Sequence, residues 1–329
     1  MRSARTKLPG HPDKACDLVA EAIVDEYLKR DPETRIQVHV TGGRGAIFVC
    51  GDVRSQADFD VAALVHRTLG SLGLVAEMEP FVALEAVSPQ QTERMLNGLD
   101  LPVTVTGYAT DETPELLPKT LAASLRAAKA IEDKRQGDEN WFWVGADGEV
   151  EVSASGSEPD SMHIVMEHGT FSLADAREQV VSLMGGILPE LKVRINELGP
   201  QEARSLVHSC GASGKHFAAY GHPLPPVDAG IGRDIHHPTK AGAWLARAAA
   251  RKLVASGSKA ALVSAVYMPG EKVPSKITAR DGQGKDLSSQ INPHELNLTR
   301  VAKEWWRPGL NFDAARWGFA GQTGLPWEV

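Results

Sequence analysis

The sequence predicts an α+β fold built from three similar units of helix and sheet. The length of 329 residues, with 42% hydrophobic and 23% charged residues, is ample for a buried core in two or three domains. Apolar residues at helical spacing alternate along the chain with short runs typical of strands. The order helix, strand, strand, helix, strand recurs, which favours one repeated module with its helices on one face of each sheet.

The first unit begins with a helix and ends with a returning strand. Its expected elements are, in order, a helix from Pro12 that Asp31-Pro32 stops, strands over 35–40 and 46–53 around a Gly-rich turn, a helix over 59–72 and a strand over 81–84. A polar stretch over 88–100 is expected to be a loop, and the alternating residues 103–106 predict a strand.

The second and third units repeat this order more loosely. The middle elements are expected to be a helix over 119–135, strands over 141–144 and 150–154 around an Asp147-Gly148 turn, an apolar run over 162–166, a helix over 173–184 and a strand over 193–195. The last elements are expected to be a helix over 239–256, a strand over 260–267 and a helix near 293–305.

Composition narrows the class of protein. The net charge of −7 argues against a protein that coats nucleic acid, although it is compatible with a local basic pocket for a small polyanion. The cysteines Cys16, Cys50 and Cys210 form no C-x-x-C pair, which indicates a reducing compartment without disulfides or structural zinc. No apolar run is long enough for a signal peptide or a membrane span, so a cytoplasmic protein is expected.

The pentapeptide Gly10-His11-Pro12-Asp13-Lys14 concentrates polar chemistry directly before the first helix. Pro12 suits the first helical turn, and the free N–H groups of a helix start favour an anion such as phosphate. Asp13 has a carboxylate that can bind a Mg²⁺ bridging phosphate oxygens, and His11 can donate to an oxygen on which negative charge develops. The alternative from the pentapeptide alone is structural, with helix-terminal charges beside a surface histidine.

Two basic segments in the second half of the chain fit anion binding. The first, Gly211-Ala212-Ser213-Gly214-Lys215-His216, has flexibility and charge but lacks the spacing of a P-loop. The second places Arg233, Asp234 and the pair His236-His237 before a helix that starts near Lys240. Adjacent histidines seldom aim both rings at one ion, so phosphate contacts are favoured over zinc.

Taken together, these segments resemble the S-adenosylmethionine synthetases (methionine adenosyltransferases), and the chain is identified as a divergent member. The matching segments are Gly10 to Lys14 with Asp17, the run from Gly107 to Pro118, the Gly-x-Ser-Gly-Lys and Pro-Thr-Lys elements that end at Lys215 and Lys240, and Pro326-Trp327-Glu328. The first two are specific, and the set spans nearly the whole chain. By itself, the acid-rich segment after Gly107 fits a capped helix entrance.

The resemblance implies three similarly folded α+β domains about a pseudo-threefold axis, expected here at residues 1–93, 94–196 and 197–329. It implies a homodimer or a dimer of dimers, with active sites between subunits that hold two Mg²⁺ ions and a monovalent cation. The implied substrates are ATP and methionine or an analogue, with no nucleic acid or membrane as partner. Methionine sulfur attacks C5′ of ATP, and the released tripolyphosphate is cleaved before the product leaves.

The resemblance also assigns roles to residues. The implied catalytic and phosphate-holding residues are His11, Lys215, Arg233 and Lys240. The implied metal ligands are Asp13 and Asp234, and the implied substrate-binding residues are Asp52, Gln90, Ser213 and His216. These roles make physical sense, because expulsion of a triphosphate needs preorganised cations, whereas a thioether attacks without a general base.

Departures from the family pattern concentrate at the methionine and nucleoside ends. His39 stands where an acid would bind the monovalent cation, which argues against a K⁺ site. Asp52 replaces a glutamate expected near the substrate amino group, and Gln201 lies near the place of an aromatic residue expected to stack on adenine. The Pro-Asp-Ala-Lys type phosphate element of the middle domain is replaced by Gly145-Ala146-Asp147-Gly148.

Three hypotheses therefore stay open. The first is a divergent ATP:methionine S-adenosyltransferase, which the retained His11 and Asp13 favour. The second keeps the fold and the triphosphate chemistry but uses another nucleophile or nucleotide, because the lost residues cluster around methionine and base. The third is a non-catalytic homologue that acts as a dimer partner.

Overall fold

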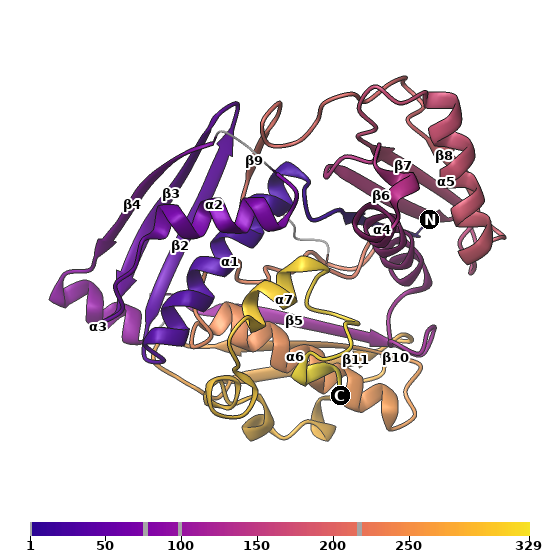
Figure 1. Cartoon of the computed structure of the whole chain (residues 1–329). Helices are drawn as coiled ribbons and strands as arrows, with labels where there is room; N and C mark the ends of the chain where they lie inside the picture. Colours follow the sequence, from indigo (N-terminus) through magenta and orange to yellow (C-terminus); the bar gives the residue numbers. More distant parts are fainter. Residues whose placement is uncertain (1, 75–77, 98–100, 216–218) are drawn as a thin grey trace.

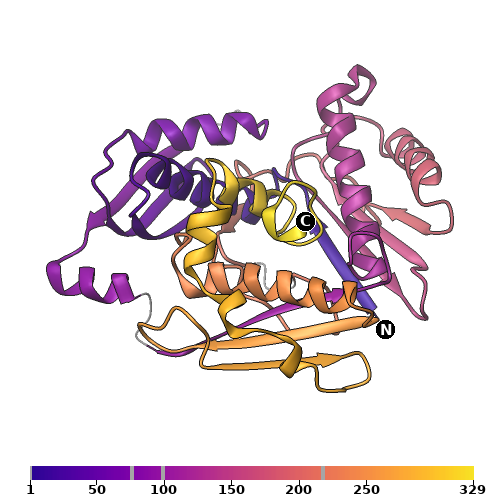
Figure 2. The same ribbon diagram turned by 90° about the horizontal axis from the view of Figure 1, so that it is seen from below.

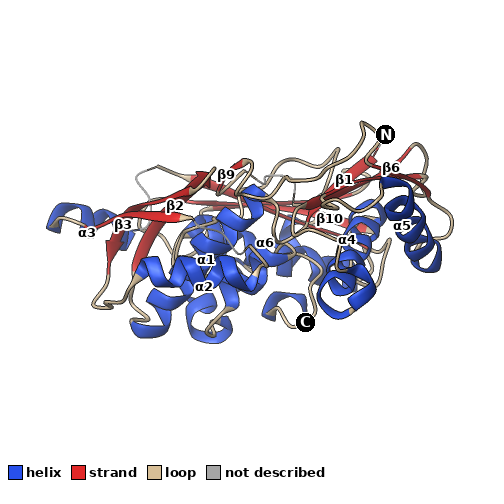
Figure 3. Ribbon diagram, turned by 45° about the horizontal axis from the view of Figure 1, so that its top comes forward, coloured by secondary structure: helices blue, strands red, loops and turns tan. Residues whose placement is uncertain are grey.

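The strands of the protein form one layer, and its helices gather on one side of that layer (Figure 3). The structure is a computed structural model that describes residues 2–74, 78–97, 101–215 and 219–329. Figure 1 shows three sheets in these residues, and Figure 2 shows the C-terminal segment, in yellow, in the middle of the three units. The expected α+β fold with three sheets is confirmed.

Each sheet contains a strand from a distant part of the chain. The first sheet, in the order β4-β3-β2-β9, consists of β4 (Glu79–Ala86), β3 (Ala46–Arg54), β2 (Arg35–Gly43) and β9 (Cys210–Ala212). The second, in the order β1-β6-β7-β8, consists of β1 (Arg2–Lys7), β6 (Gly148–Ala154), β7 (Ser161–Met166) and β8 (Lys192–Ile195). The third, in the order β11-β10-β5, consists of β11 (Lys276–Asp281), β10 (Ala260–Tyr267) and β5 (Val103–Thr110). The first sheet contains strands from both sides of the two expected domain boundaries, after residues 93 and 196. The second sheet spans the first boundary, and the third sheet spans the second. The domain boundaries themselves stay a prediction.

The α-helices of the described residues are α1 (Pro12–Arg30), α2 (Val61–Ser71), α3 (Pro89–Asn97), α4 (Lys119–Gly137), α5 (Leu173–Ile187), α6 (Pro238–Ala255) and α7 (Leu310–Arg316). At the starts of α1, α2, α5 and α6 a side chain accepts from a free N–H group of the first turn. The side chain of Asp60 accepts from Ala63 N at the start of α2, and the ring of His237 accepts from Thr239 N at the start of α6. In the part of the chain that the structure describes, no helix is long and apolar enough to cross a membrane.

Three expected elements are wrong. The stretch over 88–100 contains helix α3, because Ser88 O accepts from Thr92 N and starts a helical turn. The expected strand over 141–144 is a 3-10 turn (Glu139–Trp141) followed by a bend, since Trp141 packs against Trp143 with ring centroids 5.4 Å apart. The expected helix near 293–305 is interrupted at Asn297, whose side chain accepts from Thr299 N, leaving a 3-10 turn (Pro293–Leu296) and a short π-helix (Val301–Trp305).

Helix α1 carries a stripe of acids that is buried instead of solvated. The acidic stripe consists of Asp13, Asp17, Glu21 and Asp25, which stand four residues apart on one side of the helix. Each carboxylate accepts from a main-chain N–H of the C-terminal half, namely Ala212 at 3.1 Å, Gly214 at 2.7 Å, Gly232 at 3.1 Å and Phe312 at 2.9 Å, in that order. The stripe therefore fixes three distant segments of chain around one helix.

A second buried charge ties the C-terminus to the third sheet. Arg247 of α6 is fully buried, and its guanidinium binds both carboxylate oxygens of Glu328 at 2.7 and 2.9 Å. The same guanidinium donates to the carbonyl oxygens of Tyr108, Glu115 and Leu116. The motifs at Gly107 to Pro118 and at Pro326 to Glu328 are thus held together by one arginine.

Replacement of Glu328 by glutamine should lower the free energy of unfolding by about 3–5 kcal/mol, because it leaves the buried Arg247 without a counter-charge. Urea denaturation measures the loss. The matched control is Glu295→Gln, which breaks the exposed pair with Lys252 and should cost about 1 kcal/mol or less. Equal losses for the two variants would contradict the assigned role of Glu328.

Candidate active site at the start of helix α1

The start of α1 is built as a small polar site. His11 caps the helix: its Nδ1 accepts from Asp13 N at 3.2 Å, and Pro12 occupies the first turn. Strand β9 lies directly against this turn, because a Cβ on Gly211 would stand 2.2 Å from the carbonyl carbon of Pro12. That close approach brings the loop after β9, with Lys215, to the helix start.

Asp13 is held by two lysines and one main-chain N–H. Lys7 Nζ donates to Oδ2 at 2.8 Å, Ala212 N donates to Oδ1 at 3.1 Å, and Lys215 Nζ lies 3.5 Å from Oδ1. Burial acts to raise the pKa of Asp13, but the hydrogen bonds from Lys7 and Ala212 outweigh it and lower the pKa to about 2. The carboxylate is therefore ionised throughout the physiological range.

His11 is a neutral hydrogen-bond donor in this site. Burial and the charge of Lys7 lower its pKa to about 3, despite the opposing charge of Asp13. Because Nδ1 accepts from Asp13 N, the proton of the neutral ring is assigned to Nε2. The Nε2–H group is left to bind an acceptor, such as an oxygen on which charge develops.

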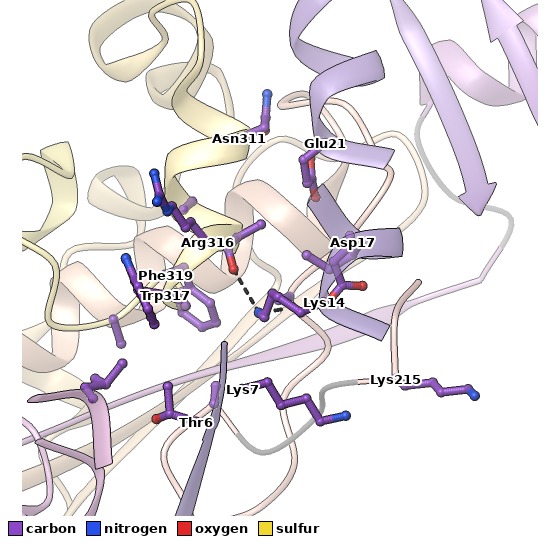
Figure 4. A pocket seen from close by; sticks show the side chains of 18 of the residues that line it. Thr6, Lys7, Lys14, Asp17, Glu21, Lys215, Asn311, Arg316, Trp317 and Phe319 are labelled. Atoms are coloured by element: carbon purple, nitrogen blue, oxygen red, sulfur yellow. Dashed lines mark hydrogen bonds and ion pairs between the residues drawn. The ribbon is translucent and has the colours of Figure 1, made fainter. Parts of the chain in front are cut away.

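A cavity of about 310 Å³ opens beside these residues, between α1, α6 and α7. Figure 4 shows Lys7 and Lys215 on one side, Lys14 in the middle, and Trp317 and Phe319 on the opposite side. Lys14 Nζ donates to Ala315 O at 2.8 Å, and burial lowers the pKa of this lysine against the attraction of Asp17. The cavity is thus lined by cations, by the acids Asp17 and Glu21 and by aromatic rings, whereas His11 and Asp13 lie at the helix start beside it and do not line it.

Of the expected catalytic residues, Lys215 lies with His11 at this site, whereas Lys240 and Arg233 are held by other side chains. Lys240 lines the cavity but is 1% exposed, and its ammonium is held by Glu21 at 2.6 Å and Asn311 at 3.0 Å. Arg233 contacts His237 at 2.6 Å and does not line the cavity.

The expected metal ligands divide in the same way. Asp13 offers one carboxylate beside a helix start, and Mg²⁺ commonly takes one or two carboxylates together with substrate phosphates and water. Asp234 does not fit, because it is 3% exposed and its two oxygens accept from Ile36 N and His236 N. Among the residues that the structure describes, no three His, Cys, Asp or Glu side chains are grouped to hold an ion.

The expected substrate-binding residues lie away from the cavity. Asp52 is exposed on β3 opposite Gln37 of β2, and Gln90 is exposed on α3. The Ser213 hydroxyl accepts from Val40 N at 3.0 Å, so it fastens the loop before Lys215 to β2. His216 lies outside the described residues.

Two features of the site were missed at the level of sequence. The four-residue spacing of the acidic stripe is visible in the sequence. If these acids had been predicted to be buried, Asp17 and Glu21 would have been assigned to the site. Lys7 stands six residues before Asp13, but no motif in the sequence pairs the two side chains; it lies at the end of β1, which pairs with β6.

Comparisons with known proteins agree with this fold. Residues 3–88 match the S-adenosylmethionine synthetase, N-terminal domain, family. The S-adenosylmethionine synthase of Aquifex aeolicus is 24% identical in an alignment that covers all of this chain and 96% of that protein. An unusual S-adenosylmethionine synthetase from Campylobacter jejuni has the same fold, with a TM-score of 0.85, 20% identity, and coverage of 100% of this chain and 97% of that chain.

The chain therefore has the three-sheet fold of that synthetase structure. The resemblance to the S-adenosylmethionine synthetases seen in the sequence is confirmed by the match over residues 3–88, by the 24% identity over the whole chain and by the shared fold.

The lowered pKa of His11 predicts a measurable pH dependence of stability. Between about pH 6.5 and about pH 3 the unfolded chain binds a proton at this ring that the folded protein does not, so His11 makes stability fall as the pH falls. His11→Gln should flatten this decline in urea denaturation series. His66→Gln, at an exposed position of α2, is the control. Parallel curves for wild type and His11→Gln would contradict the assignment.

Proposed function

We propose that the protein is an S-adenosylmethionine synthetase-like transferase, in which the sulfur of methionine attacks C5′ of ATP and tripolyphosphate leaves and is cleaved. The observation that carries the proposal is the neutral His11, with a free Nε2–H, at a helix start lined by Lys7 and Lys215. A helix start with two lysines suits a chain of phosphates, and a neutral donor suits the oxygen that departs.

The reaction needs few groups from the protein. The C5′–O bond breaks as the S–C5′ bond forms, the bonding electrons leave with the triphosphate oxygen, and the sulfonium keeps the positive charge. The residues around His11 would bind and orient the leaving group and stabilise its growing charge. A thioether carries no proton to remove, so this reaction needs no general base from the site.

Asp13 would hold Mg²⁺ that arrives with the nucleotide. Bound Mg²⁺ would supply positive charge that bridges phosphate oxygens. Asp13 is ionised and partly exposed, so it can bind a cation once Lys7 and Lys215 turn to the phosphates.

A specific observation also favours the second candidate, the same chemistry with another nucleophile or nucleotide. Asp52 and Gln90, the residues expected at the methionine end, are exposed on β3 and α3 and do not line the cavity of this chain. In a dimer they would reach the site only from the partner subunit, which leaves the choice of nucleophile to the assembled protein.

Incubation of the purified protein with ATP, methionine and Mg²⁺ should yield S-adenosylmethionine, detected by mass spectrometry. His11→Ala should lower kcat by about 10² to 10³ with a smaller change in the KM for ATP, because its contact strengthens only as charge develops. His66→Ala, on the exposed side of α2, should keep wild-type turnover.

The same assay separates the alternatives. A product formed only with another nucleotide or amino acid from a panel would support the second candidate. No product and no nucleotide binding across the panel would support a non-catalytic homologue. Unchanged turnover in His11→Ala would place the active site elsewhere.

We also propose that the protein is a homodimer through the open side of its strand layer, which the helices leave uncovered (Figure 3). On this side Phe48 and Phe81 are 49% and 50% exposed and stack with ring centroids 5.0 Å apart. Two apolar side chains of this size in one exposed sheet face favour burial against a partner.

Sedimentation should give a dimer at micromolar concentration, and Phe81→Glu should shift it toward the monomer, because the charge would be buried in the interface. Phe142→Glu is the matched control, since Phe142 is 80% exposed in the loop after the 3-10 turn and lies outside the sheet. A wild-type monomer would contradict the dimer and the shared site.

A further inference from the structure

An acidic turn lies directly behind the loop that carries His11. The acidic turn is Gly145-Ala146-Asp147-Gly148, between the stacked tryptophans and β6. A Cβ on Gly10 would stand 2.4 Å from Ala146 Cβ, and Leu8 N donates to Gly148 O at 2.8 Å. Asp147 is therefore fixed beside the loop of residues 8–11.

Asp147 is a buried acid whose carboxylate has few hydrogen-bond partners among the described residues. It is 1% exposed, and within the described residues its Oδ1 has no hydrogen-bond partner. Its nearby cation is Arg204, whose Nε lies 3.4 Å from Oδ2. Burial raises the pKa of Asp147 to about 7 in spite of Arg204, and the nearby acids Glu167 and Glu149 act in the same direction as burial.

Arg204 has N–H donors that are not used by other groups of the described residues, and it lies beside the loop that carries His11. It lies in the segment that leads from β8 into β9, and β9 supplies the Ala212 N–H to Asp13. In the part of the chain that the structure describes, no hydrogen bond occupies its terminal NH₂ groups, and its side chain is 23% exposed. Because Arg204 lies against Asp147, and the neighbouring Ala146 packs on Gly10, the guanidinium is next to the loop that carries His11.

We propose that Arg204 binds a phosphate of the substrate beside His11, and that Asp147 is the positioning residue that holds the Arg204 guanidinium there through Nε. The proposal rests on the proposed function for the presence of a phosphate chain. An arginine anchored at Nε presents its two NH₂ groups as a fork that matches two phosphate oxygens. The turn thus carries Asp147 where the family resemblance implies a phosphate-binding lysine. The positive charge would come instead from Arg204, in the segment between β8 and β9.

Two variants test the pair. Inorganic tripolyphosphate, titrated calorimetrically with Mg²⁺ present, is the probe. Arg204→Gln should weaken its binding by about 10- to 100-fold, the usual effect of losing a hydrogen bond to a charged group. Asp147→Asn should weaken it less, and should have no further effect in the Arg204→Gln background, because Asp147 acts through Arg204. Arg204→Lys should restore part of the affinity.

The readouts separate this inference from the proposed function and from a structural role. Arg300→Gln, which breaks a pair with Glu304 at 3.0 Å outside the site, is the control and should bind the probe as wild type does. Wild-type affinity in Arg204→Gln, with or without a lower melting temperature, would overturn the inference. If Arg204→Gln loses probe binding but no S-adenosylmethionine forms with wild type, the reaction is wrong and the phosphate contact stands. If the product forms and Arg204→Gln raises neither the probe Kd nor the KM for ATP, the reaction stands and Arg204 is not part of it.

Discussion

The acidic stripe of α1 is the interaction on which the rest of this structure depends. Three buried carboxylates, together with the partly exposed Asp13, are costly to desolvate unless they accept hydrogen bonds, and the helix itself offers none to side chains at these positions. They find them in main-chain N–H groups of segments near 212–214, 232 and 312. Three segments of the C-terminal half of the chain are therefore attached to α1. The loop that carries Lys215 is positioned by the same hydrogen bonds.

This coupling gives a physical reason for the uneven departures from the family pattern. His11 and Asp13 belong to the network that holds the fold, because His11 caps α1 and Asp13 accepts from Ala212 N. Asp52 and Gln90 are exposed on a sheet face and a helix, where replacements cost little stability. The residues at the start of α1 are thus constrained by stability in a way that Asp52 and Gln90 are not.

The elements with strong local signals were predicted with small errors in their ends. The hairpin of β2 and β3, helix α1 with its stop at Asp31, and the long helices α4 and α6 all follow from periodicity and caps. Errors arose where local signals were weak or misleading. The apolar run 141–144 forms a turn because its tryptophans stack, and the strands β1, β9 and β11 and helix α7 lack clear patterns of their own.

By itself the sequence determined that a histidine, a carboxylate and a lysine stand at the start of a buried helix, because those residues are neighbours along the chain and the capping geometry is local. Only the tertiary structure decided which other groups join them. Lys7 is held at the end of β1 by the pairing of that strand with β6, Arg204 packs against Asp147, and Lys240 is turned to Glu21 by burial. Such contacts depend on which groups are desolvated and on which distant main-chain N–H groups are available as partners. Neither can be predicted from the spacing of residues along the chain.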